Sequence, residues 1–296
     1  MSENANERVV ELAPAKVNLY LHVIGRRADG YHLLDSLVVF ASIGDRIEVR
    51  LADRLCLSIE GPFARDIPAD EDNLVVRAAR MLAAAAGIAP AVAIRLDKRL
   101  PVAAGIGGGS ADAAATLRAL LRLWRLDAAI MDLDRLALSL GADVPMCLAG
   151  RPVFVGGVGE VIEAAPHVPA CGLVLVNPRE ALPTPRVFAA RHGAFSAPAR
   201  LVVQARDAAE LASMVAERHN DLTRAATTLV PTIATVIERL SAMPGVLLAR
   251  MSGSGATCFG LCADADTASD VSRDLKRRHP EWWIEPASVA IETRND

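Results

Sequence analysis

Apolar and polar residues alternate along much of the first hundred residues, which is the pattern of strands with one buried face. The clearest alternation runs from Val17 to Val23. A turn is expected at 26–30, where Gly30 follows several polar residues. Shorter apolar or alternating stretches predict further strands at 37–40, 47–51, 55–59 and 92–96.

Helical spacing first appears in the middle of this region. Asn73 is placed to cap a helix that runs through Ala85 and stops at Gly87. Alanine and leucine at helical spacing predict another helix from Ser110 to Leu126. Further helices are expected at 133–140, 208–216 and 232–240, and further strands at 153–154, 161–162, 173–176, 246–249 and 257–261. A tight segment at 141–145 interrupts the pattern, and a boundary between two halves is expected within 150–185.

Composition agrees with a packed protein. The 296 residues are 52% hydrophobic and 23% charged, which excludes disorder. This length fits two average domains or one large α/β unit. The formal net charge is −3 with both signs interspersed, so the sequence offers no electrostatic footprint for nucleic acid. The compact basic cluster at 276–279 is expected to end a helix, where cations complement the helix dipole.

The five cysteines are widely spaced and include no CxxC pair, so neither a disulfide framework nor a zinc site follows from them. The first eight residues are polar and acidic and do not resemble a secretory signal. No apolar run in the sequence is long enough to span a bilayer. We therefore expect a protein of the reducing cytoplasm without a membrane partner.

A glycine-rich run carries the most specific chemistry. Gly105 and 107–109 place four glycines in five positions, directly before a predicted helix. Bare backbone can turn several N–H groups toward one point, and the helix start adds its own unpaired donors and positive dipole end. The run is neither a Walker P-loop nor a dinucleotide fingerprint. It predicts a site for the phosphates of ATP and so a small-molecule kinase, although a purely structural turn would also use glycines.

Other candidate residues are weaker when taken singly. The second glycine-rich run, 252–256, could bring another backbone close or could simply be a tight turn. Asp143 could be catalytic or could bond its local backbone. Lys16 opens an apolar strand and could equally be a surface lysine that snorkels to solvent. Tyr31 and His32 could stack on a ligand or pack in the core.

Taken in order, these motifs resemble the GHMP kinase superfamily over nearly the whole chain. The matching segments are 14–19, 27–32, 101–111, 141–145 and 252–257. The resemblance implies an α+β fold with a ribosomal-S5-like N-terminal domain, a ferredoxin-like C-terminal domain and an active site in the cleft between them. We accordingly predict an ATP-binding domain at 1–165 and a C-terminal domain at 166–296.

By the same resemblance Asp143 is the general base, Lys16 lies beside it, and Mg²⁺ arrives with ATP rather than on protein ligands. Lysine would keep the aspartate ionised and stabilise charge on the attacking oxygen. The expected ATP-binding residues are Pro101, Val102, Ala103, Ala104, Gly105, Ile106, Gly107, Gly108, Gly109, Ser110 and Ala111.

The narrower likeness is to the branch that phosphorylates the 2-hydroxyl of a methylerythritol carrying a cytidine diphosphate group, on the non-mevalonate route to isoprenoid precursors. Asn18, Tyr31, His32 and Phe188 match the substrate side of that branch, where two aromatics stack on cytosine and the histidine bonds it. The chain departs from the branch at 103, 104 and 106, where alanines and an isoleucine replace the usual glycines and leucine.

Two alternatives stay open at this point. The chain could be another kinase of the superfamily, acting on homoserine or a mevalonate-like acceptor, or a catalytically silent nucleotide-binding regulator. Tyr31, His32 and Phe188 argue against the first, and the presence of both Lys16 and Asp143 argues against the second. A small-molecule substrate, no nucleic acid, and a monomer or weak homodimer are expected.

Overall fold

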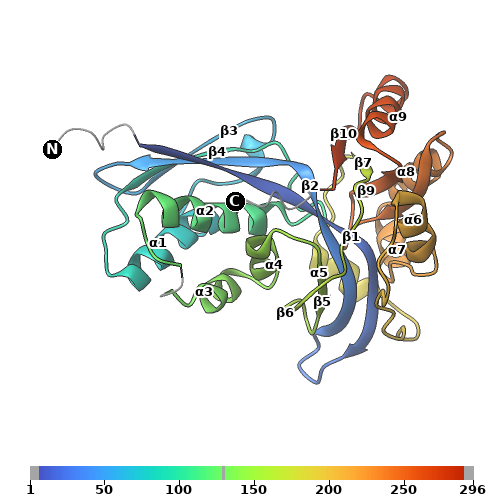
Figure 1. Cartoon of the computed structure of the whole chain (residues 1–296), viewed down its shortest axis with the longest axis horizontal. Coiled ribbons are helices and arrows are strands. Elements are labelled where there is room, and N and C mark those ends of the chain that lie inside the picture. Colours follow the sequence, from blue (N-terminus) through green and yellow to red (C-terminus); the bar gives the residue numbers. More distant parts are fainter. Residues whose placement is uncertain (1–6, 129–130, 290–296) are drawn as a thin grey trace. The chain divides into compact units, whose positions relative to one another are not determined.

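The structure is a computed structural model that describes residues 7–128 and 131–289. The chain forms two compact units (Figure 1). Among the described residues, unit 1 comprises those within 1–15, 43–102 and 107–150, and unit 2 comprises those within 16–42, 103–106 and from 151 onward. These units group residues by compactness, and the division between residues 165 and 166 stays a prediction.

Unit 1 is a small sheet with helices on one face. Strand β4 (Val92–Asp97) pairs antiparallel with the later part of β2 (His32–Leu51) and parallel with β3 (Cys56–Glu60). Helices α1 (Leu74–Ala86) and α2 (Gly108–Leu123) pack together on that face (Figure 1). The unit also contains a 3-10 turn at Ala64–Asp66 and helices α3 (Leu133–Leu140) and α4 (Val144–Ala149).

Helix α1 begins and ends where the sequence predicts. Asn73 accepts a hydrogen bond from the backbone N–H of Val75 at 3.0 Å, which satisfies one unpaired donor of the first turn. Gly87 ends the helix with φ of 67°, a left-handed conformation that glycine adopts without a steric penalty. The local sequence therefore determines both ends of α1.

Unit 2 contains the earlier part of β2 and a second sheet. In the first sheet β2 pairs with β5 (Val153–Gly156), which pairs with β6 (Val161–Ala164). The second sheet is antiparallel, in the order β10-β7-β9-β8. Its strands are β7 (Gly172–Asn177), β8 (Val246–Met251), β9 (Cys258–Cys262) and β10 (Trp283–Ser288).

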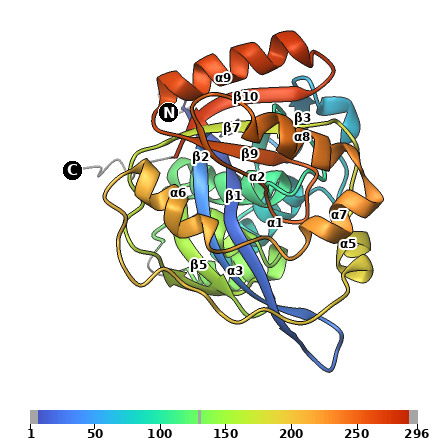
Figure 2. The same ribbon diagram turned by 90° about the vertical axis from the view of Figure 1, so that its right-hand side faces the viewer.

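Helices cover the second sheet. Helix α9 (Ala265–Arg278) runs alongside β10 and packs on β7 (Figure 2), and every residue of β7 is buried. The other helices of unit 2 are α5 (Thr184–Ala190), α6 (Ala208–Ala216), α7 (Thr223–Leu229) and α8 (Thr232–Ser241). Apolar residues of α5, α7, α8 and α9 share one core with the sheet, which includes Val176, Ile233 and Leu275.

The predicted strands are present, but the first two strands of the chain, β1 and β2, are much longer than the stretches that predicted them. The alternation at 17–23 lies within β1 (Arg8–Arg26), and the stretches at 37–40 and 47–51 are parts of the single strand β2. Buried residues occupy consecutive positions of both strands, so a strict alternation marks only part of each. The predicted interruption at 141–145 ends sooner than expected, because α4 begins at Val144.

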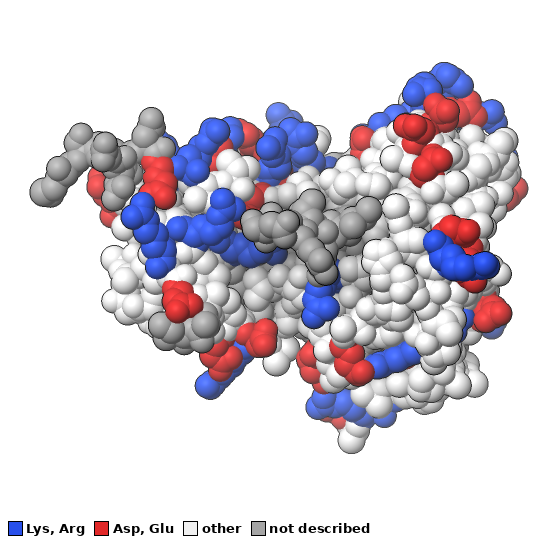
Figure 3. Space-filling model, in the orientation of Figure 1, with Lys and Arg blue, Asp and Glu red and all other residues white. Residues whose placement is uncertain are grey.

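Mixed charge covers the surface of α9 (Figure 3). Arg273 pairs with Asp270 and Arg277 pairs with Asp274, each at 2.7 Å. The basic cluster at 276–279 indeed ends this helix, as predicted, with Lys276 bonded to Glu285. In the part of the chain that the structure describes, no helix is long and apolar enough to cross a membrane.

Candidate active site

The glycine loop (101–111) packs against the second glycine-rich run through backbone contacts. The N–H of Thr257 donates to the carbonyl of Ala104 at 3.1 Å, and the Ser252 hydroxyl donates to the carbonyl of Gly105 at 3.3 Å. A Cβ atom on Gly105 would lie 2.6 Å from the Ser252 carbonyl oxygen and 2.7 Å from two backbone atoms of Gly255. Only glycine fits at 105, because these neighbours are backbone and cannot move aside.

The second glycine-rich run therefore has both of the roles that the sequence left open, a tight turn and a close backbone approach. It is the tight connection between β8 and β9, and it brings its backbone against the glycine loop. Gly253 makes the reciprocal approach: a Cβ atom there would lie 2.6 Å from the Gly105 carbonyl oxygen. The second run therefore contacts the glycine loop through backbone atoms of both segments.

The remaining glycines of the loop open helix α2. Gly107 is the N-cap residue with φ of 67°, and it has no side chain to cap the first turn. Gly109 is exposed, and a Cβ atom there would meet only the Leu74 side chain, at 3.6 Å. The first-turn N–H groups of α2 and its positive dipole end are therefore presented by bare backbone, as an anion site requires.

One departure from the usual loop sequence has a structural consequence. Ala103 has φ of 50°, in the left-handed region where a Cβ atom is unfavourable. Ala104 is buried and does not share this conformation. The backbone conformation at 103 would therefore be less strained with glycine than with alanine, whereas the conformation at 104 gives glycine no such advantage.

Lys16 and Asn18 lie side by side on β1 and are both buried. The Lys16 ammonium donates to the Asn18 side-chain oxygen at 2.9 Å, and the Asn18 amide donates to the Ser36 hydroxyl at 2.8 Å. The backbone of Asn18 also donates to the Ser252 hydroxyl at 3.1 Å. The surface-lysine alternative for Lys16 is therefore wrong, because only 7% of the residue is exposed.

Asp143 occupies the N-cap position of α4 in unit 1, whereas Lys16 belongs to unit 2. Its backbone carbonyl accepts from the N–H of Cys147 at 3.2 Å, but its carboxylate does not cap the helix. The residue is half-buried. The catalytic role of Asp143 therefore stays a prediction.

Two of the four predicted substrate residues are in contact. The rings of His32 and Phe188 stack with centroids 5.2 Å apart and planes inclined by 27°. Burial lowers the pKa of His32, and the nearby charges of Arg26 and Arg191 lower it further. A neutral imidazole has one donor and one acceptor nitrogen, which suits it to bonding a base edge.

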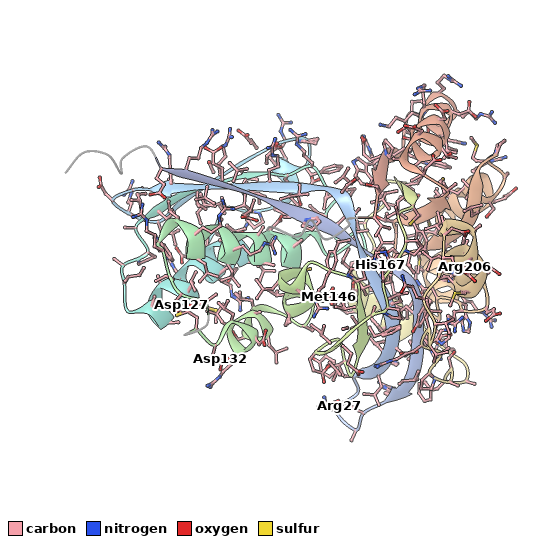
Figure 4. All side chains as sticks on the ribbon, viewed as in Figure 1. Arg27, Asp127, Asp132, Met146, His167 and Arg206 are labelled. Carbon is pink, nitrogen blue, oxygen red and sulfur yellow. The ribbon has the colours of Figure 1, made fainter. Side chains whose placement is uncertain are left out.

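Tyr31 directly precedes His32 in the chain and is exposed. It closes the turn between β1 and β2, whose tip is marked by Arg27 in Figure 4, and 64% of the residue is exposed. An exposed aromatic in a chain with few aromatics is available to a ligand. Its predicted stacking role stays a prediction.

A buried ionic cluster that was not predicted from the sequence lies beneath the start of α2. The Lys98 ammonium donates to Asp45 at 2.5 Å and to Asp112 at 2.7 Å, and no more than 4% of any of these side chains is exposed. The three residues are far apart in sequence, and no motif joins them. The available signal was Asp112 itself, an acid among the alanines of α2 that are buried on every side of the helix.

No cluster of three or more His, Cys, Asp or Glu side chains within 7–128 and 131–289 is arranged to hold a metal ion.

Family comparisons define the class of this protein. The family described as "GHMP kinases N terminal domain" matches residues 73–151, which include the whole glycine loop and Asp143. The family described as "GHMP kinases C terminal" matches residues 199–281. The predicted α+β GHMP kinase fold and the prediction of an ATP-dependent kinase are thereby confirmed.

Whole-chain relatives narrow the class. A 4-diphosphocytidyl-2-C-methyl-D-erythritol kinase from Paramagnetospirillum magneticum is 56% identical over 277 residues, which cover 94% of this chain and 97% of that protein. The protein of the same name from Rhodospirillum rubrum is 52% identical, with 94% of this chain and 92% of that protein covered. The chain belongs to the family of 4-diphosphocytidyl-2-C-methyl-D-erythritol kinases.

Solved structures agree. A crystal structure of 4-(cytidine 5'-diphospho)-2C-methyl-D-erythritol kinase matches with a TM-score of 0.78 and 36% identity, covering 95% of this chain and 100% of that one. A homoserine kinase from Cytophaga hutchinsonii matches with a TM-score of 0.75 at 18% identity, covering 98% and 96%. The second likeness shows a shared fold and nothing more specific.

Proposed function

We propose that this protein transfers the γ-phosphoryl group of ATP to the 2-hydroxyl of 4-diphosphocytidyl-2-C-methyl-D-erythritol. The single observation that carries the proposal is the 56% identity over 94% of the chain to a relative of that name. The site geometry is compatible with it, since the chain combines a bare-backbone anion site with a histidine–phenylalanine stack.

In the proposed complex the glycine loop holds the ATP phosphates. The N–H groups of the first turn of α2 would donate to phosphate oxygens, and the helix dipole would favour their negative charge. Mg²⁺ would arrive on the phosphates and neutralise the charge that develops during transfer. Packing of Gly105 on the second glycine-rich run keeps the backbone of the loop fixed for this purpose.

Asp143 is proposed as the general base and Lys16 as its cationic partner in the reaction. Asp143 would take the proton of the 2-hydroxyl as the oxygen attacks the γ-phosphorus and the bond to ADP breaks. Lys16 would stabilise the negative charge on the attacking oxygen. Its bond to Asn18 directs the ammonium along β1, which gives Asn18 an orienting role.

The cytosine is proposed to lie against the aromatic residues of unit 2. Phe188 and Tyr31 would supply stacking surfaces, and neutral His32 would bond the base edge. A site that bonds the edge of one base discriminates against others, because an unmatched polar group would be left without a partner. This part of the site is what separates the proposal from a homoserine or mevalonate kinase.

The test is an ADP-release assay on purified protein with ATP, Mg²⁺ and the proposed acceptor. Turnover should depend on all three components. Asp143→Ala should reduce kcat by about 10²- to 10⁴-fold, the range of general base catalysis, with ADP affinity unchanged. Asp143→Asn is the matched control for shape, and it should be as inactive as the alanine variant.

Two outcomes would count against the proposal. Absence of turnover at saturating ATP would favour a silent nucleotide-binding regulator, and full activity of Asp143→Ala would remove the proposed base. Cytidine 5'-diphosphate should compete with the acceptor, whereas a kinase acting on homoserine or mevalonate has no reason to bind cytosine. A monomer or weak homodimer in the cytoplasm stays the expectation for its state, to be checked by light scattering and cell fractionation.

A further inference from the structure

We propose that Lys98, Asp45 and Asp112 are positioning residues of the glycine loop. They would hold the backbone leading into the loop and the first turn of the helix leaving it at a fixed separation. The inference rests on the proposed function, in which this loop binds the phosphates of ATP. None of the three residues is among the residues predicted from the sequence to contact nucleotide.

Asp45 fixes the chain on the way into the loop. Its Oδ1 atom accepts from the backbone N–H groups of Arg99 at 2.5 Å and Leu100 at 2.8 Å, the last two residues before Pro101. Its Oδ2 atom accepts from the Lys98 ammonium at 2.5 Å. Asp45 is fully buried on β2, so these bonds join the loop to the sheet of unit 1.

The Lys98 ammonium also holds helix α2, which follows the loop. Lys98 donates at 2.7 Å to the carboxylate of Asp112, which lies in the second turn of α2. A Cβ atom on Gly108 would lie 3.1 Å from the Lys98 Nζ atom and 3.7 Å from Asp45 Oδ2. The cluster therefore lies directly beneath the first residue of the helix, and one ammonium connects both ends of the loop.

The two carboxylates are not equivalent. Asp45 receives three donors, whereas Asp112 receives one, and its Oδ1 atom is buried with no hydrogen-bond partner in the described residues. The charged groups that face Asp112 are Lys98 and Asp45. Burial raises the pKa of Asp112, which the Lys98 charge only partly opposes. A bound nucleotide anion would favour the protonated form of Asp112, because the cluster then carries no net charge.

A merely stabilising cluster makes a different prediction. Buried charges are weak evidence for stability, since desolvation offsets much of their attraction. If the cluster only stabilised unit 1, cutting it would lower the melting temperature and the fraction of active protein but leave the nucleotide affinity of the folded fraction unchanged. If the cluster positions the loop, cutting it changes the nucleotide affinity of the folded protein.

The experiment compares Asp112→Ala, Asp112→Asn and Thr116→Val with the wild type. Asparagine keeps an acceptor for Lys98, and Thr116→Val removes the buried hydrogen bond from Thr116 to the Asp112 carbonyl, one turn further along the same helix. Calorimetric Kd for ADP with Mg²⁺, KM for ATP and KM for the acceptor are measured from pH 7 to 9, together with the melting temperature. Comparing variants at each pH removes the titration of ADP itself.

We expect Asp112→Ala to raise Kd for ADP and KM for ATP by about 10-fold, with KM for the acceptor within about 2-fold. Asp112→Asn should restore the ADP affinity to within about 3-fold at pH 7, because it restores the bond to Lys98. Wild-type ADP affinity should fall as pH rises, because Asp112 then loses the proton that nucleotide binding favours, and Asp112→Asn should abolish this fall. Thr116→Val should leave all affinities unchanged.

Wild-type ADP affinity in Asp112→Ala, accompanied by a lower melting temperature, would overturn the inference. If Asp112→Ala does not fold, parallel pH dependence in the wild type and Asp112→Asn would overturn it instead. A wild type that binds ADP but does not phosphorylate the acceptor contradicts the proposed acceptor alone, and the ADP affinities of the variants still decide the role of the cluster. A wild type that binds no nucleotide overturns both.

Discussion

The two glycine-rich runs of this chain have similar sequences but different structural roles. In the second run, 252–256, Gly253 and Gly255 adopt left-handed φ angles of 54° and 84° within a connection between antiparallel strands. In the glycine loop Gly105, with φ of 73°, makes a close contact with the backbone of the second run. Gly107 and the two glycines after it start helix α2 instead.

Glycine content alone therefore does not identify a ligand site. A glycine can be required because another backbone lies where its Cβ atom would be, or because N–H groups must be left uncovered. The first requirement is a matter of folding stability and the second a matter of affinity. Substitutions at single glycines should therefore separate the two roles.

Gly105→Ala should have the largest effect on stability. Its Cβ atom would overlap three backbone atoms, and φ of 73° is unfavourable for alanine. We expect a loss of about 3 kcal/mol or more in the free energy of unfolding, measured by urea denaturation. Gly87→Ala is the matched control, since it also has a positive φ of 67° but nothing lies within 4 Å of its Cβ position. Equal losses in both variants would mean that backbone conformation, not the contact between the runs, sets the requirement.

Asp112→Asn should change how the stability of the protein depends on pH, because Asp112 belongs to the buried ionic cluster beneath the glycine loop. Burial raises the pKa of Asp112 to about 7, against the opposing effect of Lys98. Between its ordinary value near 4 and about 7, the folded state keeps a proton that the unfolded state loses, so stability falls as pH rises through this window.

Asparagine does not titrate, so the substitution should stabilise the protein more at pH 8 than at pH 5. A difference of about 1–2 kcal/mol between the two pH values is expected from denaturation curves. Thr116→Val is the control in the same helix, and its effect should not vary with pH. A stabilisation by Asp112→Asn that is constant from pH 5 to pH 8 would contradict the assigned charge state.

Gly109→Ala, unlike Gly105→Ala, should weaken ATP binding without lowering stability. There is room for its Cβ atom, and alanine favours a helix, so stability should stay constant or rise by up to about 1 kcal/mol. KM for ATP should nevertheless rise about 10-fold, because a methyl group would stand where the phosphates approach the first turn. An unchanged KM would place the phosphates away from this helix start.

Ala103→Gly should have the smallest effect. Relief of the left-handed conformation at φ of 50° and the greater freedom of glycine in the unfolded chain nearly cancel, leaving a gain of at most about 0.5 kcal/mol. Ala104→Gly is the control, and it should lose about 1 kcal/mol because it removes a buried methyl group without any such relief. Melting temperatures of the two variants should shift in opposite directions.

Local signals in the sequence predicted the elements that local interactions determine. The caps of α1, at Asn73 and Gly87, and the passage from the glycine loop into α2 are examples. Helices α5 and α7 were not predicted, because each has only seven residues and α5 begins beside two prolines that resemble a turn.

Long-range interactions account for what sequence reasoning missed in the site. Lys98 meets Asp45 and Asp112 only because β2, the end of β4 and α2 come together in the fold. Likewise, the burial of Lys16 follows from neighbours such as Ser36 and Ser252 that bond its partner Asn18. No spacing along the chain carries this information.

³¹P NMR of the wild-type reaction with ATP and Mg²⁺ shows whether the chain phosphorylates 4-diphosphocytidyl-2-C-methyl-D-erythritol. We expect a new phosphomonoester resonance that grows in step with ADP and is coupled to the carbon that bore the 2-hydroxyl, while the diphosphate of the acceptor stays intact. ADP formed together with free inorganic phosphate, or no consumption of ATP, would contradict it.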